Sequence, residues 1–186
     1  MIASAKSRSL RRVALVAAYM LGAEWARALV VQQPGLAPAA LLLGGAALAA
    51  VAVGWRAEQL GLGTSRFGLR ILGGLALGAV LLLPAAARSG AAPLLPAGLA
   101  FAAIAVSIGE EIAFRGVLYA ALEAVGGAPL AILGSTILWT LAHVLSHPPA
   151  FLGAVAAAGL LLALWRWACK DLVGPILGHV IADLAL

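Results

Sequence analysis

The sequence is a succession of apolar stretches, separated by short polar or glycine- and proline-containing breaks. A membrane-spanning helix needs about 20 mostly apolar residues to cross the hydrocarbon core of a bilayer. Seven stretches are of this kind, at residues 13–31, 37–55, 71–87, 94–123, 129–146, 150–165 and 171–186. The pattern predicts an all-α fold, a polytopic membrane helical bundle with about seven transmembrane helices.

Composition supports this prediction. Hydrophobic residues make up 64% of the 186 residues and charged residues 10%, whereas soluble proteins contain about 25% charged residues. We therefore expect a single integral membrane domain, in which residues 1–93 supply supporting spans and residues 94–186 carry the functional groups. The single cysteine, Cys169, excludes an intramolecular disulfide.

The distribution of basic residues predicts the orientation. The net charge is +5, but the Lys and Arg residues lie beside span ends, which favours positive-inside topology over nucleic-acid binding. With a cytoplasmic N-terminus, the only basic residue in the opposite connections is Arg88. The cytoplasmic side then holds Lys6, Arg8, Arg11, Arg12, Arg56, Arg66, Arg70, Arg166 and Lys170. We expect residues 13–31 to be an uncleaved first span.

Three charged residues interrupt the fourth stretch. A charge at the bilayer centre costs about 3 kcal/mol, so an ionisable residue there predicts a functional site. Glu111 and Arg115 are spaced i and i+4, share a helix face and can pair. Glu110 is rotated by roughly 100° from Glu111, which leaves its carboxylate available for chemistry. The structural alternative is an ion pair that holds two helices together.

Further polar groups lie in other spans. His143 is in the fifth, and His179 and Asp183 are i and i+4 in the seventh. Counting along the helices places Glu110 and His143 roughly 20 Å from the cytoplasmic side and His179 about 12 Å. Glu24 and Arg27, in the first span, are expected to satisfy each other.

These residue types are compatible with two mechanisms. A buried glutamate can act as a base on water, while histidines orient the water or stabilise an oxyanion. Two histidines and one glutamate also form a typical catalytic zinc site, in which Glu110, His143 and His179 would be the ligands. His147 makes a His-x-x-x-His pair with His143, but Pro148 places it at a helix end, which favours a loop or lipid-interface role. Trp139 is expected to pack in the core.

The motifs resemble those of the CPBP family, the CAAX-prenyl-protease and bacteriocin-processing intramembrane proteases, also called the Abi family. They are Glu110-Glu111-x-x-x-Arg115, Trp139-x-x-x-His143 and His179-x-x-x-Asp183, and the resemblance covers residues 101–184. It implies that residues 94–186 form the catalytic core. It also implies that Glu110 is the base, His143 positions the water, His179 and Asp183 form the oxyanion site, and Glu111 and Arg115 are supports.

Two residues depart from the family pattern. Trp139 replaces the usual Phe, and Asp183 stands where prenyl proteases have Asn. An ionised Asp cannot donate to an oxyanion, so Asp183 is either protonated or orients His179.

The expected function is therefore intramembrane hydrolysis of a peptide bond in a membrane-anchored or lipid-modified protein or peptide. We expect no cofactor, with zinc as the alternative, and no nucleic-acid partner. The expected location is the bacterial cell (inner) membrane. The competing functions are a catalytically silent immunity or scaffold protein that binds a partner helix, and a small proton-coupled transporter.

Overall fold

The computed structural model describes residues 2–83 and 95–185, with side chains from residue 9 onward. Helices make up the described chain, and these two ranges contain no strand. The longer helices are α1 (Ile2–Val31), α2 (Ala37–Ala49), α4 (Phe67–Leu81), α6 (Ala97–Glu111), α7 (Tyr119–Ala142), α8 (Leu152–Cys169) and α9 (Val173–Ala185). The short helix α3 (Ala57–Leu60) connects α2 to α4, and a π-helical segment, Ile112–Leu118, joins α6 to α7.

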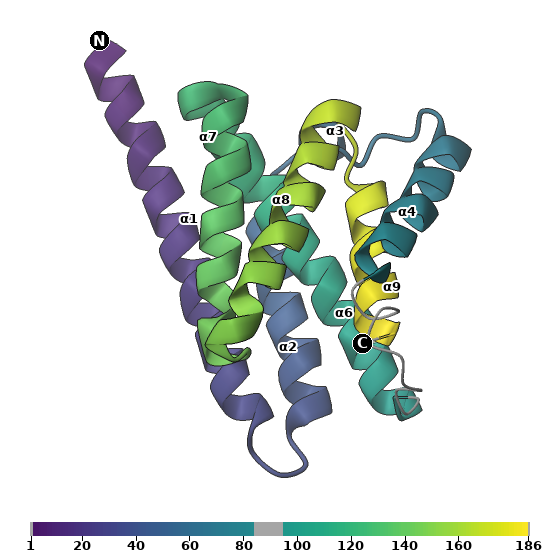
Figure 1. Ribbon diagram of the computed structural model, residues 1–186. Helices are drawn as coiled ribbons and strands as arrows, with labels where there is room; N and C mark the ends of the chain where they lie inside the picture. Colours follow the sequence, from purple (N-terminus) through teal and green to yellow (C-terminus); the bar gives the residue numbers. More distant parts are fainter. Residues whose placement is uncertain (1, 84–94, 186) are drawn as a thin grey trace.

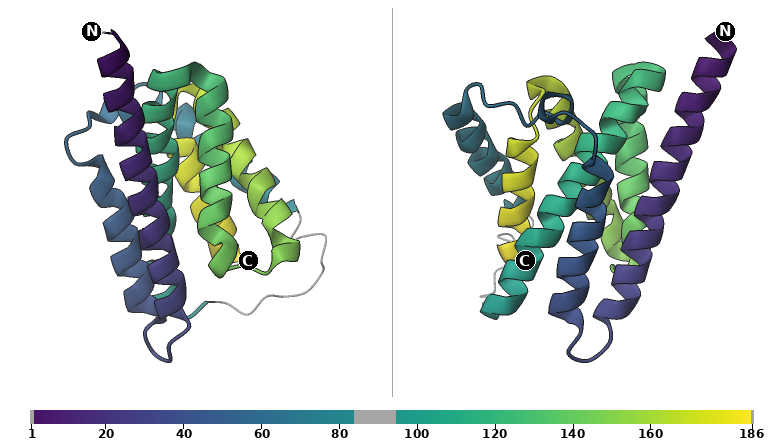
Figure 2. Two further views of the ribbon diagram at one scale, coloured as in Figure 1. Left: turned by 90° about the vertical axis from the view of Figure 1, so that its left-hand side faces the viewer. Right: turned by 180° about the vertical axis from the view of Figure 1, so that it is seen from behind.

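The helices run alternately up and down between two ends of one bundle (Figure 1). The N-terminus, α3 and the α8–α9 connection lie at the top of Figure 1. The α1–α2 turn and the C-terminal end of α9 lie at the opposite end, as the views in Figure 2 also show. We refer to these as the N-terminal end and the opposite end of the bundle.

Hydropathy and length support a membrane protein. Among the described residues, three helical stretches are long and apolar enough to cross a membrane: Ser9–Val31, Ala97–Leu145 and Pro149–Cys169. Three shorter apolar helices are Ala37–Ala52, Phe67–Leu81 and Val173–Ala185. The longest stretch contains non-helical backbone at Gly126 and Gly127, where the chain reverses. This break divides the stretch Ala97–Leu145 into two spans. The described helices then match the seven predicted spans in order.

Several predicted boundaries are wrong. Helix α1 extends from Ile2, before the predicted span that begins at residue 13, and α4 begins at Phe67, inside the connection predicted between the spans that end at residue 55 and begin at residue 71. Helix α8 continues to Cys169, so Arg166 is helical and buried instead of lying in a loop. The end of the predicted third span, the turn at residues 88–93 and the start of the fourth span at residue 94 lie outside the described residues.

Close backbone approach fixes α2 against α6. A Cβ atom on Gly109 would overlap the carbonyl of Gly45, and one on Gly45 would lie 2.6 Å from the carbonyl oxygen of Ala105. Small residues allow this packing where membrane helices cross. Helix α1 is in turn fixed to α2 and α7, because the Tyr19 hydroxyl donates to the Ala47 carbonyl and Trp25 Nε1 donates to the Leu141 carbonyl. These contacts place α1 beside the motif-bearing helices.

Candidate active site

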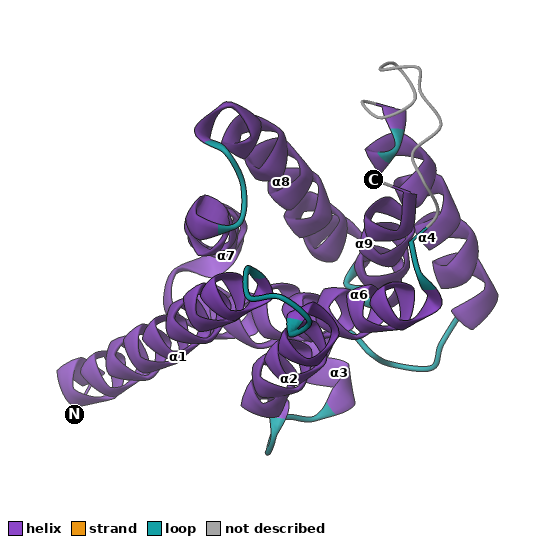
Figure 3. Cartoon of the chain, turned by 90° about the horizontal axis from the view of Figure 1, so that it is seen from below, coloured by secondary structure: helices purple, strands orange, loops and turns teal. Residues whose placement is uncertain are grey.

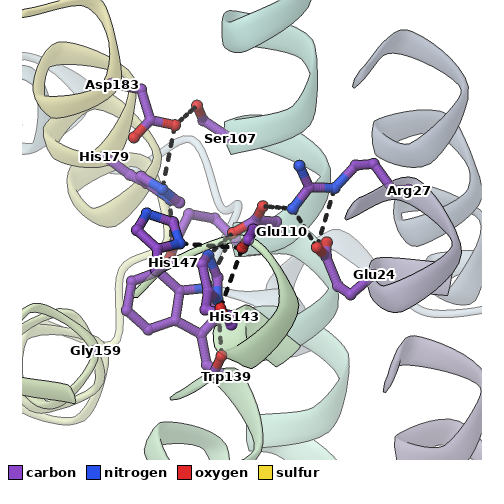
Figure 4. Close-up of polar contacts among 12 residues, drawn as sticks. Glu24, Arg27, Ser107, Glu110, Trp139, His143, His147, Gly159, His179 and Asp183 are labelled. Atoms are coloured by element: carbon purple, nitrogen blue, oxygen red, sulfur yellow. Dashed lines mark hydrogen bonds and ion pairs between the residues drawn. The ribbon is translucent and has the colours of Figure 1, made fainter. Parts of the chain in front are cut away.

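A cavity of about 660 Å³ lies among α1, α6, α7, α8 and α9, with α4 and one residue of α2 at its edge. Its polar lining contains Ser146 and most of the polar residues singled out in the sequence: Arg27, Glu110, Trp139, His143, His147, His179 and Asp183. Its other walls are apolar and come mainly from α4 and α8, at Val80, Leu81, Ala154, Ala157, Ala158 and Leu161. Figure 4 shows the polar side chains of α1, α6, α7, α9 and the segment after α7 converging on one another. The arrangement combines a charged cluster with a surface suited to an apolar chain segment.

Glu110 is the centre of the cluster. Its side chain is only 4% exposed, and its two oxygens have different partners. Oε1 accepts a hydrogen bond from Arg27 at 3.2 Å, whereas Oε2 accepts from Trp139 Nε1 at 2.9 Å and lies 3.5 Å from His143 Nε2. Charge-assisted hydrogen bonds of this kind hold a carboxylate in a defined orientation. The carboxylate lies at the cavity wall, with Oε2 on the side of His143.

Three sequence predictions about these residues need correction. Glu110 does not stand unpartnered, because Arg27 of the first span reaches it. The Glu24–Arg27 pair does form, with Arg27 Nε donating to Glu24 Oε2 at 3.0 Å, but it is not self-contained. The same guanidinium bridges Glu24 and Glu110. Trp139 is buried as expected, yet it also donates to the carboxylate and is not only a packing residue.

Glu111 and Arg115 form the predicted ion pair behind the cavity. Arg115 Nη1 donates to Glu111 Oε1 at 2.8 Å, and both side chains are fully buried. The pair spans the start of the π-helical segment, whose wider turns are frequent at functional sites. Arg166 donates to the carbonyl of Arg115 at 3.2 Å, and Arg115 donates to the carbonyl of Gly159. These contacts fix the segment that carries the glutamate pair.

His179 bonds to Glu111 rather than to Glu110. Its Nδ1 lies 2.9 Å from Glu111 Oε1, and its Nε2 lies 3.4 Å from Asp183 Oδ2. The expected difference in depth between Glu110 and His179 therefore does not separate His179 from the cluster. Asp183 Oδ2 also lies 2.7 Å from the Ser107 hydroxyl, which is itself 2.7 Å from the carbonyl of Ala103. Asp183 thus contacts His179 on its own helix and joins α9 to α6.

His143 is held so that one nitrogen faces the carboxylate. Its Nδ1 lies 2.8 Å from the carbonyl of Trp139, and a carbonyl can only accept. Nδ1 is therefore protonated, and in the neutral ring Nε2 is an acceptor beside Glu110. Two neighbouring acceptors form a natural site for the two hydrogens of one water molecule.

His147 lies in the loop after the helical turn at His143, as Pro148 predicted, and the structure adds that it faces the cavity. It is half-buried, lines the cavity, and its ring centroid lies 5.2 Å from that of His143. Its ring stacks on Phe151 and its Nδ1 lies 3.0 Å from the Ser146 hydroxyl. Partial burial lowers the pKa of His147, which favours the neutral ring at neutral pH. The four-residue spacing to His143 was the sequence signal for this proximity.

The residues are not arranged as a zinc site. Each ring nitrogen of His179 faces a carboxylate, and Nδ1 of His143 faces a backbone carbonyl. Within residues 2–83 and 95–185, no group of three or more His, Cys, Asp or Glu side chains is placed to hold a metal ion. The side chains do not fit the metal as they stand, so no step below uses one.

An apolar helical bundle built around a buried carboxylate–imidazole cluster defines a class of membrane proteins with an internal acid–base site. Comparison with known families identifies which one. The family described as Type II CAAX prenyl endopeptidase Rce1-like matches residues 92–185, about half of the chain, and the protein belongs to this family. The match contains all three motifs, which agrees with the resemblance seen in the sequence. Neither the curated proteins nor the solved structures gave a match.

Family membership and hydropathy together identify an integral membrane protein with, in general terms, the function of a CAAX-type endopeptidase. Glu24 and Arg27 lie outside the matched residues, although Arg27 contacts Glu110 directly.

Proposed function

We propose that the protein is an intramembrane endopeptidase that hydrolyses a peptide bond of a membrane-anchored or lipid-modified protein or peptide without a metal ion. The single observation that carries the proposal is the placement of Glu110 Oε2 and His143 Nε2, 3.5 Å apart, on the wall of a largely apolar cavity. A base and a water-orienting imidazole at that spacing are suited to activating water.

Glu110 acts as the general base. A water at the cavity wall donates one hydrogen to Glu110 and the other to His143 Nε2, which directs an oxygen lone pair toward the substrate carbonyl. As the water oxygen bonds to the carbonyl carbon, Glu110 takes its proton. The carbon–nitrogen bond then breaks, and the same proton passes to the leaving amine, so that hydrolysis consumes one water and returns Glu110 to its ionised form.

His179 stabilises the oxyanion of the tetrahedral intermediate. Carboxylates flank both of its nitrogens, and a doubly protonated ring satisfies both of them. Nε2 is the nitrogen that donates to the oxyanion, because its contact with Asp183 is the longer one and lies at the cavity. The positive charge of the ring also offsets the negative charge that develops on the carbonyl oxygen. In this scheme Asp183 acts through His179 and is a positioning residue. Glu111 and Arg115 are structural supports, because neither of them lines the cavity.

The apolar walls favour a membrane-embedded substrate. Val80, Leu161 and the alanines of α8 offer a surface for an apolar segment, and the polar cluster lies along one side of it. The protein itself would lie in a bacterial cell membrane with its N-terminus in the cytoplasm, as the positive-inside bias supports.

The test compares two glutamine substitutions. Termini of membrane proteins are identified by proteomics in cells that express wild type, Glu110→Gln or Glu123→Gln. Glu123 is the matched control, because it pairs with Lys170 at a partly exposed position away from the cavity. Cleaved termini that are present with wild type and Glu123→Gln, and lost with Glu110→Gln, support the proposal. The same termini in all three strains would refute it and favour a catalytically silent scaffold.

A further inference from the structure

The described basic residues outside the site all lie toward one end of the bundle. They are Arg11 and Arg12 of α1, Arg56, Arg66 and Arg70 around α3 and the start of α4, and Arg166 and Lys170 at the end of α8. Arg12 lies over the ring of Trp55, 4.9 Å from its centroid, which brings α1 and the α2–α3 connection together there. In Figure 1 this is the N-terminal end of the bundle. Positive-inside topology assigns that end to the cytoplasm.

The cavity lies toward the other end. Helices that run down in Figure 1 contribute residues close to their last turn: Arg27 of α1, Val80 of α4 and Asp183 of α9. His143 follows the last residue of α7. Two helices that run up contribute residues close to their first turn, Leu41 of α2 and Ala154 of α8, whereas Glu110 lies next to the last residue of α6. Arg27 is four residues from the end of α1, about 6 Å, and fifteen residues from Arg12, about 22 Å.

The bundle is filled on the cytoplasmic side of the cavity. Phe114, Arg115, Leu118 and Tyr119 are fully buried and lie on the helical segment that leads from Glu110 toward the N-terminal end. Arg166 is buried next to them, with its guanidinium 5.4 Å from the centre of the Tyr119 ring. At the opposite end, Ser146 is exposed and His147 half-buried, and both line the cavity. Figure 3 looks at this end along the helices.

We infer that the cavity opens on the extracytoplasmic side of the membrane, and that the substrate's scissile bond enters from the outer leaflet. The substrate class is then a membrane-anchored protein or peptide whose cleavage site lies within a few residues of the outer membrane surface. A lipid-modified tail held at the cytoplasmic surface would be about 20 Å from Glu110, on the far side of the filled layer. The inference rests on the proposed orientation and on the cavity, and not on the proposed chemistry.

The test uses cysteine accessibility in intact bacterial cells with a membrane-impermeant, sulfonated thiol reagent. Cys169 is the only cysteine, is exposed and precedes Lys170, so the wild-type chain already carries a reporter at the basic end. In a Cys169→Ser background, Gln33→Cys reports the side of the exposed α1–α2 turn, and Ser146→Cys reports the cavity mouth. A cytosolic thiol protein in the same cells checks that the reagent stays outside.

We expect the reagent to modify Gln33→Cys and Ser146→Cys in intact cells and to modify Cys169 only after permeabilisation. Modification of Cys169 alone, or of cysteines at both ends, would overturn the inference, because it would place the mouth in the cytoplasm or show mixed orientation. If the reagent modifies Gln33→Cys but not Ser146→Cys, the orientation stands and the inference that the cavity opens at this end is overturned. Each measurement is repeated in the Glu110→Gln background. Because cysteine accessibility does not depend on turnover, its result stands even if the peptidase proposal fails.

Discussion

Arg27 Nη2 lies 3.2 Å from Glu110 Oε1, and the two residues are 83 positions apart in the chain. The contact makes the first span a part of the site, although the residues matched to the family begin at position 92. Gly44 of α2 allows it, because a Cβ there would lie 2.5 Å from Cδ of Arg27. The guanidinium fixes one oxygen of the carboxylate, so that the other faces His143.

Replacing Arg27 should reduce turnover more than it reduces substrate binding. A hydrogen bond to a charged group contributes about 1.5–3 kcal/mol, so Arg27→Gln should lower kcat about tenfold to a hundredfold. Arg27→Lys, which keeps the charge, should recover part of the loss. Steady-state kinetics of the purified variants would measure both effects, with Arg11→Gln as a control at an exposed position of the same helix.

Folding must be separated from catalysis for this variant, because Arg27→Gln also leaves the buried Glu24 without its partner. The double variant Glu24→Gln/Arg27→Gln removes that burial penalty and should restore folded yield without restoring kcat. A double variant with wild-type kcat would show that Arg27 has no role in the reaction.

The two glutamates of the motif should respond differently to the same change. Glu110→Gln removes the base and should lower turnover by about 10²–10⁴-fold, with little change in thermal stability. Glu111→Gln leaves the fully buried Arg115 without its ion pair, which costs about 3–5 kcal/mol, and it weakens the contact to His179. Thermal unfolding in detergent, measured beside turnover, should separate the two. Equal loss of stability in both variants would contradict these roles.

Local spacing predicted some of these contacts and could not predict others. The Glu111–Arg115 pair and the break at Gly126–Gly127 follow from helix periodicity and glycine conformation within a few residues. The Arg27–Glu110 contact depends on how α1 packs against α6, and no periodicity within a single helix encodes that packing. The same holds for the contact of His179 with Glu111, where depth counting assumed straight helices of equal tilt. The π-helical turn after Glu111 leaves no visible pattern in the sequence.

Asp183→Asn should be tolerated. A single oxygen, Asp183 Oδ2, contacts both the Ser107 hydroxyl at 2.7 Å and His179 Nε2 at 3.4 Å. The amide oxygen of an Asn can take the place of Oδ2 and accept from both partners. Asp183→Asn should therefore keep turnover within a few-fold of wild type, whereas Asp183→Ala should lose the orientation of His179 and lower kcat. Kinetics in which Asn is as damaging as Ala would show that the negative charge is required.

The crossing of α2 and α6 gives a prediction about stability. Gly109→Ala should force the two helices apart, since its Cβ would overlap the Gly45 carbonyl, and overpacking costs about 1–3 kcal/mol or more. Gly98→Ala is the matched control on the same helix, because no atom lies within 4 Å of a Cβ there. Thermal unfolding should show a lower midpoint for Gly109→Ala only. A similar midpoint for both variants would mean that the helices are not in close contact at Gly45.

Removing metal ions should leave the activity unchanged. If Glu110, His143 and His179 were zinc ligands, His179 would have to release Glu111 or Asp183, and Glu110 could no longer take a proton from water. Glu111 is a poor substitute as the base, because it is paired with Arg115 and does not line the cavity. Purified protein treated with a chelator should therefore retain wild-type turnover and contain far less than one zinc per chain by elemental analysis. A stoichiometric zinc whose removal abolishes turnover, and whose return restores it, would change Glu110 from base to ligand and require a rearranged His179.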